Sequence, residues 1–327
     1  MEVKKLSASS YKKWAFCEHA FFIENVLNYH YPAGKAASIG TITHAILESL
    51  AEIKLAQQRK LVEVDIDGVG TLKSFDPIDV VSLSEQIYAH QTQNVLNTLK
   101  WEKTDLTTVK KHVNKAITHN NGIFNPLNRT IIQTEQYIKI KIDEDWAILP
   151  SGGQLNITGF IDLVTKVDEN TIEIIDWKTG SQLKDFLSGQ ELNYENIRND
   201  IQLRMYHLAA SKIYGEDKSY MLTMFFTNFG KVFTYNFSVE DIKYTKELIK
   251  KKFLEIHGCK IPRRSITWKC RKFCDYAKNT RSDSPIQFID NQITAVGDKM
   301  CLCDQVYYEV NRRGLQWTVE NMSNDSK

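Results

Sequence analysis

Two aspartates and a lysine lie in neighbouring segments where they could hold a divalent cation. Asp162 ends the sequence G-F-I-D, and Asp176 and Lys178 lie in the sequence I-I-D-W-K-T-G. Because side chains alternate along a strand, Asp176 and Lys178 leave it on the same face. Two carboxylates that converge on a cation, with an amine beside them, can orient an attacking water and stabilise charge that develops on phosphorus. This set of residues predicts metal-assisted hydrolysis of a phosphodiester.

The segment that joins these residues has the pattern of a β-hairpin. Residues 155–167 and 171–177 are rich in β-forming side chains, and the sequence D-E-N between them is a turn signal. A turn centred on Glu169 places Asp162 directly opposite Asp176, with Cβ atoms about 4.5–5.5 Å apart. Two like charges at that separation are costly unless a cation lies between them. The predicted register therefore requires a metal ion.

Other segments supply the elements that must position this hairpin. Apolar spacing predicts helices in residues 1–30, 38–58, 82–118, 196–213 and 239–257. Alternation predicts strands in residues 131–142, 220–228 and 231–237. Residues 62–77 contain glycines and aspartates typical of a loop or small hairpin. The chain from Pro262 onward is expected to be irregular. The pattern predicts an α/β protein.

The hairpin sequence resembles the RecB-type form of the PD-(D/E)XK nuclease motif, written G-x-x-D followed by a hydrophobic residue and D-x-K-T-G. Gln202 and Tyr206 fit the Q-x-x-x-Y helix that follows this core. His44, in G-T-I-T-H-A-I-L-E, fits an upstream helix that supplies a metal-binding histidine. The motifs occur in the order typical of RecB, AddB and Cas4-like exonucleases, and they span residues 40–206.

The resemblance implies a restriction-endonuclease-like α/β fold, with a mixed central β-sheet flanked by helices. It implies an N-terminal helical region over residues 1–130 that carries the His44 helix, and a nuclease core over residues 131–260. A cysteine-containing C-terminal tail, residues 261–327, is expected to pack back on the N-terminal region.

The resemblance also implies roles for individual residues. Asp162 and Asp176 would be carboxylate ligands, His44 would add an imidazole nitrogen, and Trp177 would add its backbone carbonyl. The imidazole favours Mn²⁺ more than an all-oxygen site would, so the expected cofactor is Mg²⁺ or Mn²⁺. Lys178 would lie near the scissile phosphate and the attacking water.

Three further residues are implied to support the site. Gln202 and Tyr206, one helical turn apart, would buttress the lysine or contact the DNA backbone. Glu135, on the strand before the hairpin, would reach the active site through water. Each candidate also has a structural alternative: a surface strand pair for Asp176 and Lys178, a half-buried helix histidine for His44, a solvent-facing strand residue for Glu135, and packing residues for Gln202 and Tyr206.

The cysteines resemble, in part, the ligands of the [4Fe-4S] cluster that several of these nucleases hold with one N-terminal and three C-terminal cysteines. Cys17 occupies the first place, and Cys270 and Cys274 begin the C-terminal group. Three residues separate this pair where the family pattern has two, and the fourth ligand would be Cys301 or Cys303. An iron–sulfur cluster, a zinc site and free cysteines are the alternatives. A cluster would tie the tail to the N-terminal helices.

The composition sets few limits on the function. The chain has 327 residues, 42% hydrophobic and 25% charged, and its net charge of +2 neither favours nor excludes a nucleic-acid partner. No run approaches the roughly 18 apolar residues of a membrane helix, and the N-terminus lacks the apolar stretch of a signal peptide. We expect a cytoplasmic protein without membrane contact, or one in the host cytoplasm if it is encoded by a phage.

The expected activity is that of a Mg²⁺- or Mn²⁺-dependent DNA exonuclease. It would act on linear single- or double-stranded ends in recombination, repair or phage DNA processing. The sequence has no G-x-x-x-x-G-K-[ST] motif, so a helicase or recombination partner would be a separate chain. The alternatives are a Cas4-like nuclease of CRISPR adaptation, a structure-specific endonuclease, and a non-catalytic DNA-binding scaffold subunit. The intact aspartates and lysine argue against the scaffold.

Overall fold

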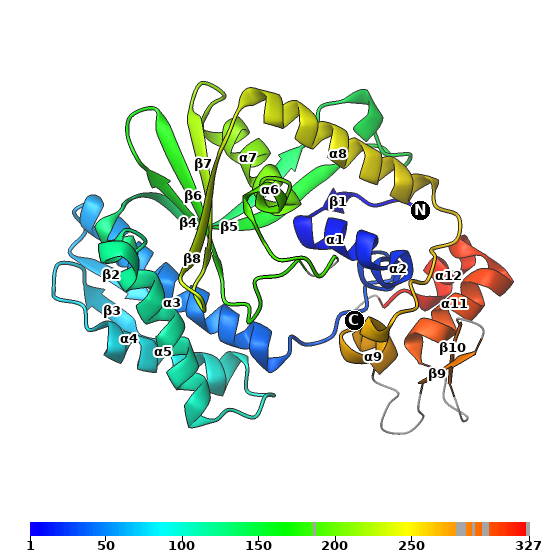
Figure 1. Ribbon diagram of the computed structural model, residues 1–327, viewed down its shortest axis with the longest axis horizontal. Helices are drawn as coiled ribbons and strands as arrows, with labels where there is room; N and C mark the ends of the chain where they lie inside the picture. The colour runs from blue at the N-terminus through cyan, green and yellow to red at the C-terminus, as the bar shows by residue number, and fades with distance from the viewer. Residues whose placement is uncertain (186–187, 279–285, 290–291, 296–300, 325–327) are drawn as a thin grey trace. The chain divides into compact units, whose positions relative to one another are not determined.

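The computed structural model describes residues 1–185, 188–278, 286–289, 292–295 and 301–324 (Figure 1). The chain divides into two compact units. The first unit consists of Met1–Pro32, Ile140–Thr158 and Lys246–Lys327, and the second of Ala33–Lys139 and Gly159–Thr245. Among the described helices, none combines the length and the apolar character needed to cross a lipid bilayer.

Both units combine strands and helices. The strands are, in chain order, β1 (Lys5–Leu6), β2 (Glu63–Ile66), β3 (Gly70–Lys73), β4 (Thr130–Lys141), β5 (Asn156–Lys166), β6 (Thr171–Lys178), β7 (Ser219–Phe226), β8 (Lys231–Phe237), β9 (Ile286–Ile289) and β10 (Gln292–Ala295). The helices are α1 (Ala8–Phe16), α2 (Glu18–Asn25), α3 (Lys35–Gln58), α4 (Val80–His90), α5 (Lys103–Thr118), α6 (Tyr194–Arg198), α7 (Ile201–Tyr214), α8 (Val239–Gly258), α9 (Trp268–Lys272), α10 (Asp275–Lys278), α11 (Leu302–Arg313) and α12 (Leu315–Met322).

A mixed sheet forms the centre of the second unit, which confirms the predicted fold class. Its strand order is β5-β6-β7-β8, and β4 also pairs with β5. The β5–β6 and β7–β8 pairs are antiparallel, and the β6–β7 pair is parallel. Because parallel neighbours cannot be joined by a tight turn, the chain crosses from β6 to β7 through α6 and α7.

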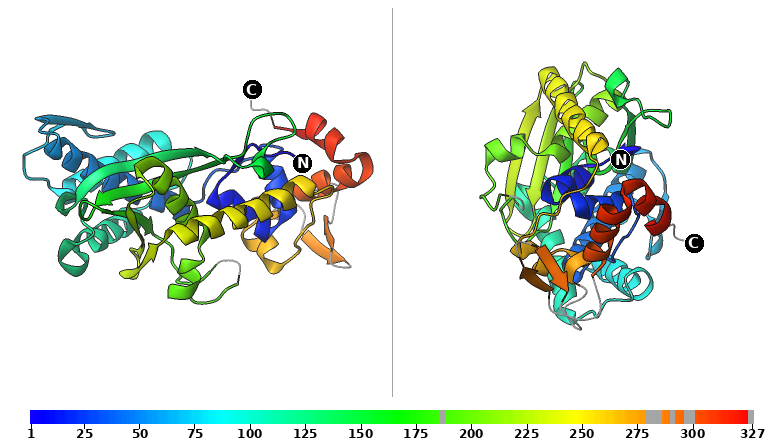
Figure 2. Two further views of the ribbon diagram at one scale, coloured as in Figure 1. Left: turned by 90° about the horizontal axis from the view of Figure 1, so that it is seen from above. Right: turned by 90° about the vertical axis from the view of Figure 1, so that its right-hand side faces the viewer.

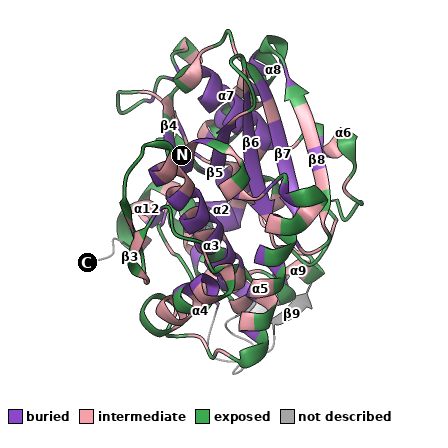
Figure 3. Cartoon of the chain, turned by 90° about the vertical axis from the view of Figure 1, so that its left-hand side faces the viewer, coloured by how far each residue is buried: buried purple, intermediate pink, exposed green. Residues whose placement is uncertain are grey.

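The β5–β6 hairpin has the register that the sequence predicts. Leu163 pairs with Ile175, and Lys166 pairs with Ile172. The same register places Asp162 opposite Asp176, one step beyond the last ladder pair. Every residue of β6 except the first and the last is buried (Figure 3), as expected for a central strand covered on both faces.

Helix α3 packs on this sheet through one apolar stripe. Ile42, Ile46, Leu50 and Ile53 are fully buried and are spaced three or four residues apart, so they share one helix face. They belong to the same core cluster as Trp177 of β6. This packing fixes the distance between the His44 helix and the β5–β6 hairpin.

The helix predicted over residues 82–118 is interrupted. Helix α4 ends at His90, a π-helical turn follows at Gln91–Val95, and α5 begins only at Lys103. The Trp101 indole donates a hydrogen bond to the Leu96 carbonyl and holds the connection. The segment predicted as a loop or small hairpin forms the two-stranded hairpin β2–β3 (Figure 2).

The expectation of an irregular tail is wrong for residues 302–322 of the first unit. These residues form α11 and α12. Val306 and Val310, four residues apart on α11, join Phe22 and Ile23 of α2 in one core cluster. The apolar stripe of α11 is short and lies among many charged residues, so the sequence alone did not mark it as a helix.

Candidate active site

His44 of α3 lies against the end of the β5–β6 hairpin. Its Nε2 lies 3.0 Å from the carbonyl oxygen of Trp177, and its Nδ1 lies 3.6 Å from Oδ1 of Asp162. The imidazole stands edge-on to the Trp177 indole, with ring centroids 6.2 Å apart. The helix therefore delivers an imidazole to the place where β5 and β6 carry their carboxylates.

Gly40 allows this close approach of α3. A Cβ atom at position 40 would lie 2.8 Å from Oγ1 of Thr179, in the loop that follows β6. That separation is shorter than the contact distance of a carbon and an oxygen atom, so a larger residue would force the Thr179 side chain or the helix to move. The glycine that opens the G-x-x-x-H sequence therefore permits this close contact.

His44, Glu135 and Asp162 form a group with the spacing of metal ligands, which we call the three-ligand group. One donor atom from each lies within 4.8 Å of the donor atoms of the other two. Glu135 has a φ of +40°, which is uncommon for a residue other than glycine and marks an irregular point in β4. The sequence predicts that Glu135 reaches the active site through water. In the structure it is a candidate for direct metal binding.

The carboxylate of Asp162 explains why the β5–β6 ladder stops at this point. Its Oδ2 accepts a hydrogen bond of 2.8 Å from the backbone N–H of Trp177. This N–H is therefore bound by a side chain and does not pair with β5, and the backbone pairing of the two strands ends at Leu163 and Ile175.

Asp176 is buried and lies outside the three-ligand group. Its Oδ1 accepts a hydrogen bond of 3.0 Å from Gln202 Nε2, and its Oδ2 lies 2.7 Å from Lys178 Nζ. Despite this ion pair, Oδ2 accepts no hydrogen bond of regular geometry from the residues that the structure describes. A buried carboxylate oxygen in that state can bind a cation, so these residues fit a divalent metal ion.

Gln202 and Tyr206 connect the lysine to the sheet. Gln202 Oε1 accepts a hydrogen bond of 2.9 Å from Lys178 Nζ, and its Nε2 donates to the Tyr206 hydroxyl at 2.7 Å. The Tyr206 hydroxyl in turn donates to the carbonyl of Phe160. Asp200 caps α7 by accepting from the Gln202 backbone N–H. Of the two placements implied by the resemblance, this geometry favours support of the lysine.

The charges of the site perturb one another. Burial lowers the pKa of His44 and the Asp162 carboxylate raises it, and the net pKa is raised to about 9. Burial raises the pKa of Asp162, but the neighbouring His44 has a larger opposite effect, so the pKa lies below its ordinary value. Burial raises the pKa of Asp176 to about 6 and that of Glu135 to about 7. Crowded, partly desolvated carboxylates are the environment that a divalent cation stabilises.

Glu48 is a candidate that the sequence analysis did not single out. It follows His44 by one helical turn, so both side chains lie on one face of α3. An open hollow of about 620 Å³ is lined by His44, Glu48, Glu135 and Lys178, among other residues. Burial, followed by the nearby Glu52, raises the pKa of Glu48 to about 7. The spacing in H-A-I-L-E is the signal that could have identified it.

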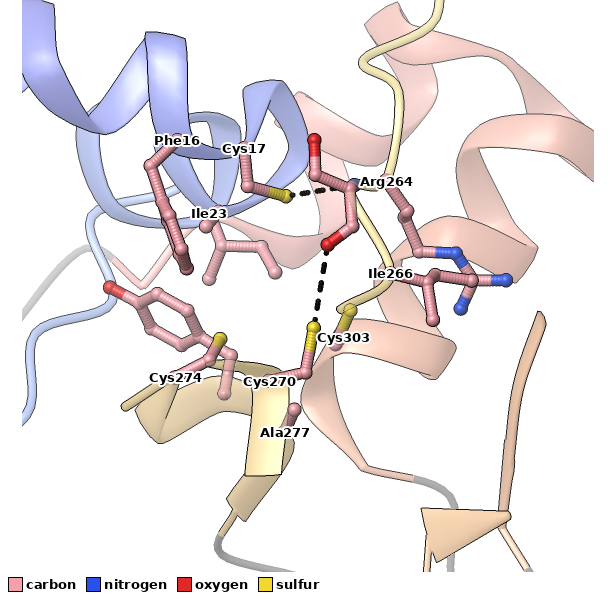
Figure 4. A pocket seen from close by; sticks show the side chains of 12 residues that line it. Phe16, Cys17, Ile23, Arg264, Ile266, Cys270, Cys274, Ala277 and Cys303 are labelled. Atoms are coloured by element: carbon pink, nitrogen blue, oxygen red, sulfur yellow. Dashed lines mark hydrogen bonds between the residues drawn. The ribbon is translucent and has the colours of Figure 1, made fainter. Parts of the chain in front are cut away.

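A second candidate site, which we call the cysteine cavity, lies in the first unit (Figure 4). Four cysteines line it: Cys17 between α1 and α2, Cys270 in α9, Cys274 after α9, and Cys303 in α11. All four are unpaired thiols. Burial raises the pKa of Cys274 to about 11 and that of Cys303 well above its ordinary value.

The cavity suits thiolate ligands of a metal cluster. The backbone N–H of Ser265 lies 3.5 Å from Cys17 Sγ, and that of Thr267 lies 3.4 Å from Cys270 Sγ. Such N–H···S contacts stabilise cluster-bound sulfur. Arg264 also lines the cavity, and its guanidinium forms an ion pair with Asp304 at 2.6 Å.

Cys301 is not among the residues that line the cysteine cavity. Its Sγ lies 3.0 Å from Oδ2 of Asp304, within the first turn of α11. Cys303, two residues later, is the one that lines the cavity. The structure therefore separates the two cysteines that the sequence left as equal candidates.

The mixed sheet and the carboxylate–lysine hairpin define a metal-dependent nuclease. A sequence profile described as the PD-(D/E)XK nuclease superfamily matches residues 5–278, and the chain belongs to this superfamily. No protein of curated function matches it.

Two solved structures are similar to this chain. One is the crystal structure of a "Putative exonuclease" from Eubacterium rectale, which aligns with this chain over 92% of the length of each. The two chains are 10% identical in sequence, and the TM-score is 0.50. At that identity the likeness concerns the fold alone. The structure of SSO0001 has a TM-score of 0.33 and 13% identity, and covers 84% of each chain.

Proposed function

We propose that this protein is a divalent-metal-dependent deoxyribonuclease that degrades DNA from its ends, in the RecB and Cas4-like branch of the superfamily. The observation that carries the proposal is the three-ligand group of His44, Glu135 and Asp162 beside the Asp176–Lys178 ion pair. The order of the four motifs supports the branch. The name of the Eubacterium rectale protein, "Putative exonuclease", agrees with this activity.

Each residue has a defined task in this proposal. His44, Glu135 and Asp162 would hold Mg²⁺ or Mn²⁺. Asp176 and the carbonyl of Trp177 would be further oxygen ligands. When bound, the cation polarises the phosphate and makes water a better nucleophile. Lys178 donates to the phosphate oxygens or orients the attacking water, and Gln202 holds its ammonium group in place. The two aspartates and the lysine must be positioned before the substrate arrives, because preorganised charges avoid the cost of reorganisation.

The test is digestion of labelled DNA by the full chain with Mg²⁺, with Mn²⁺ and with EDTA. The substrates are linear duplex DNA labelled at either end, single-stranded DNA, and covalently closed circular DNA. We expect metal-dependent release of short products from linear DNA and no cutting of the circle. Cutting of the circle would favour a structure-specific endonuclease, and binding without cleavage of any substrate would favour the scaffold subunit. The proposed setting is the cytoplasm, with any helicase or recombination partner on another chain.

We also propose that the cysteine cavity holds a [4Fe-4S] cluster through Cys17, Cys270, Cys274 and Cys303. Three observations support it: four free thiols share one cavity, two accept backbone N–H contacts, and an arginine lies beside them. These thiols come from α1–α2, α9 and α11, so a cluster would join segments far apart in sequence. Its role in this proposal is structural.

Cys303 and Cys301 offer a matched pair of variants for this second proposal. Anaerobically purified wild-type protein should show broad visible absorption and contain iron and labile sulfide. Cys303→Ala should lose both, whereas Cys301→Ala should keep them, because Cys301 contacts Asp304. If the protein contains zinc and shows no visible absorption, the cavity is a zinc site and the cluster proposal is wrong. Protein without any bound metal would contradict the proposal.

A further inference from the structure

Two exposed aromatic side chains contact each other on the sheet of the second unit. Tyr137 of β4 is 54% exposed and Phe160 of β5 is 55% exposed. Their ring centroids are 5.1 Å apart, with the ring planes tilted by 48°. Water contact with two large rings is unfavourable, so such a pair is typical of a surface that binds a ligand.

This aromatic pair lies beside the three-ligand group, on the same two strands that carry Glu135 and Asp162. Tyr137 follows Glu135 by two residues on β4, and Phe160 precedes Asp162 by two residues on β5. On β5, which is regular here, side chains two residues apart leave the strand on the same side, about 6–7 Å from each other, so Phe160 and Asp162 share a face. Because Glu135 lies near Asp162 and Tyr137 touches Phe160, the two cross-strand pairs form one continuous row.

The charge beyond the aromatic pair is positive. Lys139 follows Tyr137 by two residues on β4 and is exposed. The row therefore runs from carboxylates and imidazole, through two rings, to an ammonium group. A nucleic-acid strand offers the same chemistry in sequence: a phosphate for the metal, a flat base for the rings, and another phosphate for the lysine.

We propose that Tyr137 and Phe160 form a stacking platform for an unpaired base of the DNA strand whose phosphate lies at the three-ligand group. This inference rests on the proposed nuclease function and names its substrate class. A base within a duplex is already stacked on both faces, whereas an unpaired base offers a face to an aromatic side chain. The platform therefore selects single-stranded DNA, or a frayed duplex end, over intact duplex DNA.

Binding measurements test the platform directly. The background is the non-cleaving Asp176→Ala variant, and the probes are a labelled single-stranded oligonucleotide and the matched blunt duplex. Phe160→Ala and Tyr137→Ala should each weaken single-strand binding by about fivefold to a hundredfold, the range found when a base-stacking ring is removed. Duplex binding should change by less than about twofold. Phe160→Trp should retain single-strand binding.

Phe75→Ala is the matched control, because Phe75 is an equally exposed phenylalanine, 61% exposed, in the turn after β3. It should leave both affinities unchanged. Phe160→Leu keeps apolar bulk without a ring and should behave like Phe160→Ala. Equal loss of single-strand and duplex binding in Phe160→Ala, or full binding by Phe160→Leu, would overturn the platform.

Cleavage by the wild-type chain separates this inference from the function on which it rests. If wild-type protein cleaves DNA but Phe160→Ala shows no selective loss, the nuclease proposal stands and the platform is refuted. If Phe160→Ala loses single-strand binding selectively and wild-type protein cleaves no DNA, the platform stands as a DNA-binding site and the nuclease proposal fails. Thermal unfolding of each variant confirms that the exposed substitutions leave the fold intact.

Discussion

Replacement of Gln202 by leucine removes a side chain that contacts three residues of the proposed active site. The Gln202 amide accepts from Lys178, donates to Asp176, and donates to the Tyr206 hydroxyl. Leucine has a similar size, so the helix should keep its packing while the three polar contacts are lost. The variant therefore tests whether this network positions the charged residues for catalysis.

The three lost contacts differ in their cost. Lys178 is about one-third exposed and can bind water instead, and Tyr206 keeps the Phe160 carbonyl as its acceptor. Asp176 is 1% exposed and cannot replace its donor with water. A hydrogen bond to a charged group contributes about 1.5–3 kcal/mol. If that loss falls on the transition state, kcat/KM should decrease by about tenfold to a hundredfold, at 1.36 kcal/mol for each factor of ten.

The assay is steady-state cleavage of single-stranded DNA, with unfolding by urea measured on the same preparations. Tyr214→Phe is the matched control: it removes the 2.6 Å hydrogen bond from Tyr214 to Gln136 at the other end of α7. Both variants should lose stability, with about 0.5–1.5 kcal/mol for the tyrosine contact. Only Gln202→Leu should lose activity. Full activity in Gln202→Leu, or an equal loss in Tyr214→Phe, would refute the positioning role of Gln202.

Three further predictions concern other residues of the second unit. Asp176→Ala and Lys178→Ala should each abolish cleavage while DNA binding largely persists, as measured by digestion and by anisotropy; wild-type cleavage by Asp176→Ala would contradict the assigned site. Gly40→Val should cost about 1–3 kcal/mol in urea unfolding, because the new side chain overlaps Thr179; Thr179→Ala in the same chain should restore part of that loss. Burial lowers the pKa of His207 to about 4. The His207 side chain therefore stays neutral in the folded protein, whereas in the unfolded chain it takes up a proton below about pH 6.5. The free energy of unfolding should therefore fall by up to about 3 kcal/mol between about pH 6.5 and 4, and His207→Gln should show a shallower fall.

The arrangement of the β5–β6 hairpin could be predicted from the sequence because local forces decide it. Strand alternation and a short polar turn leave one register that pairs the two β-rich runs, and Leu163 pairs with Ile175 as that register requires. The fold class followed from the same patterns together with the motif order. Where the periodic signal was short, as in α11 with its two buried valines, the sequence did not reveal the helix.

The membership of the site was decided by tertiary structure. Glu135 approaches Asp162, and Glu48 lines the same hollow as His44 and Glu135, because β4 and α3 pack beside the β5–β6 hairpin. No local sequence pattern encodes the distance between Glu135 and Asp162. The same holds for Cys303, which lines the cysteine cavity while Cys301, two residues earlier, does not. The sequence determined which side chains could bind a cation or a cluster. The packing of distant segments determined which of these side chains meet. The reason is that ligand distances of a few ångströms depend on contacts between residues far apart in the chain.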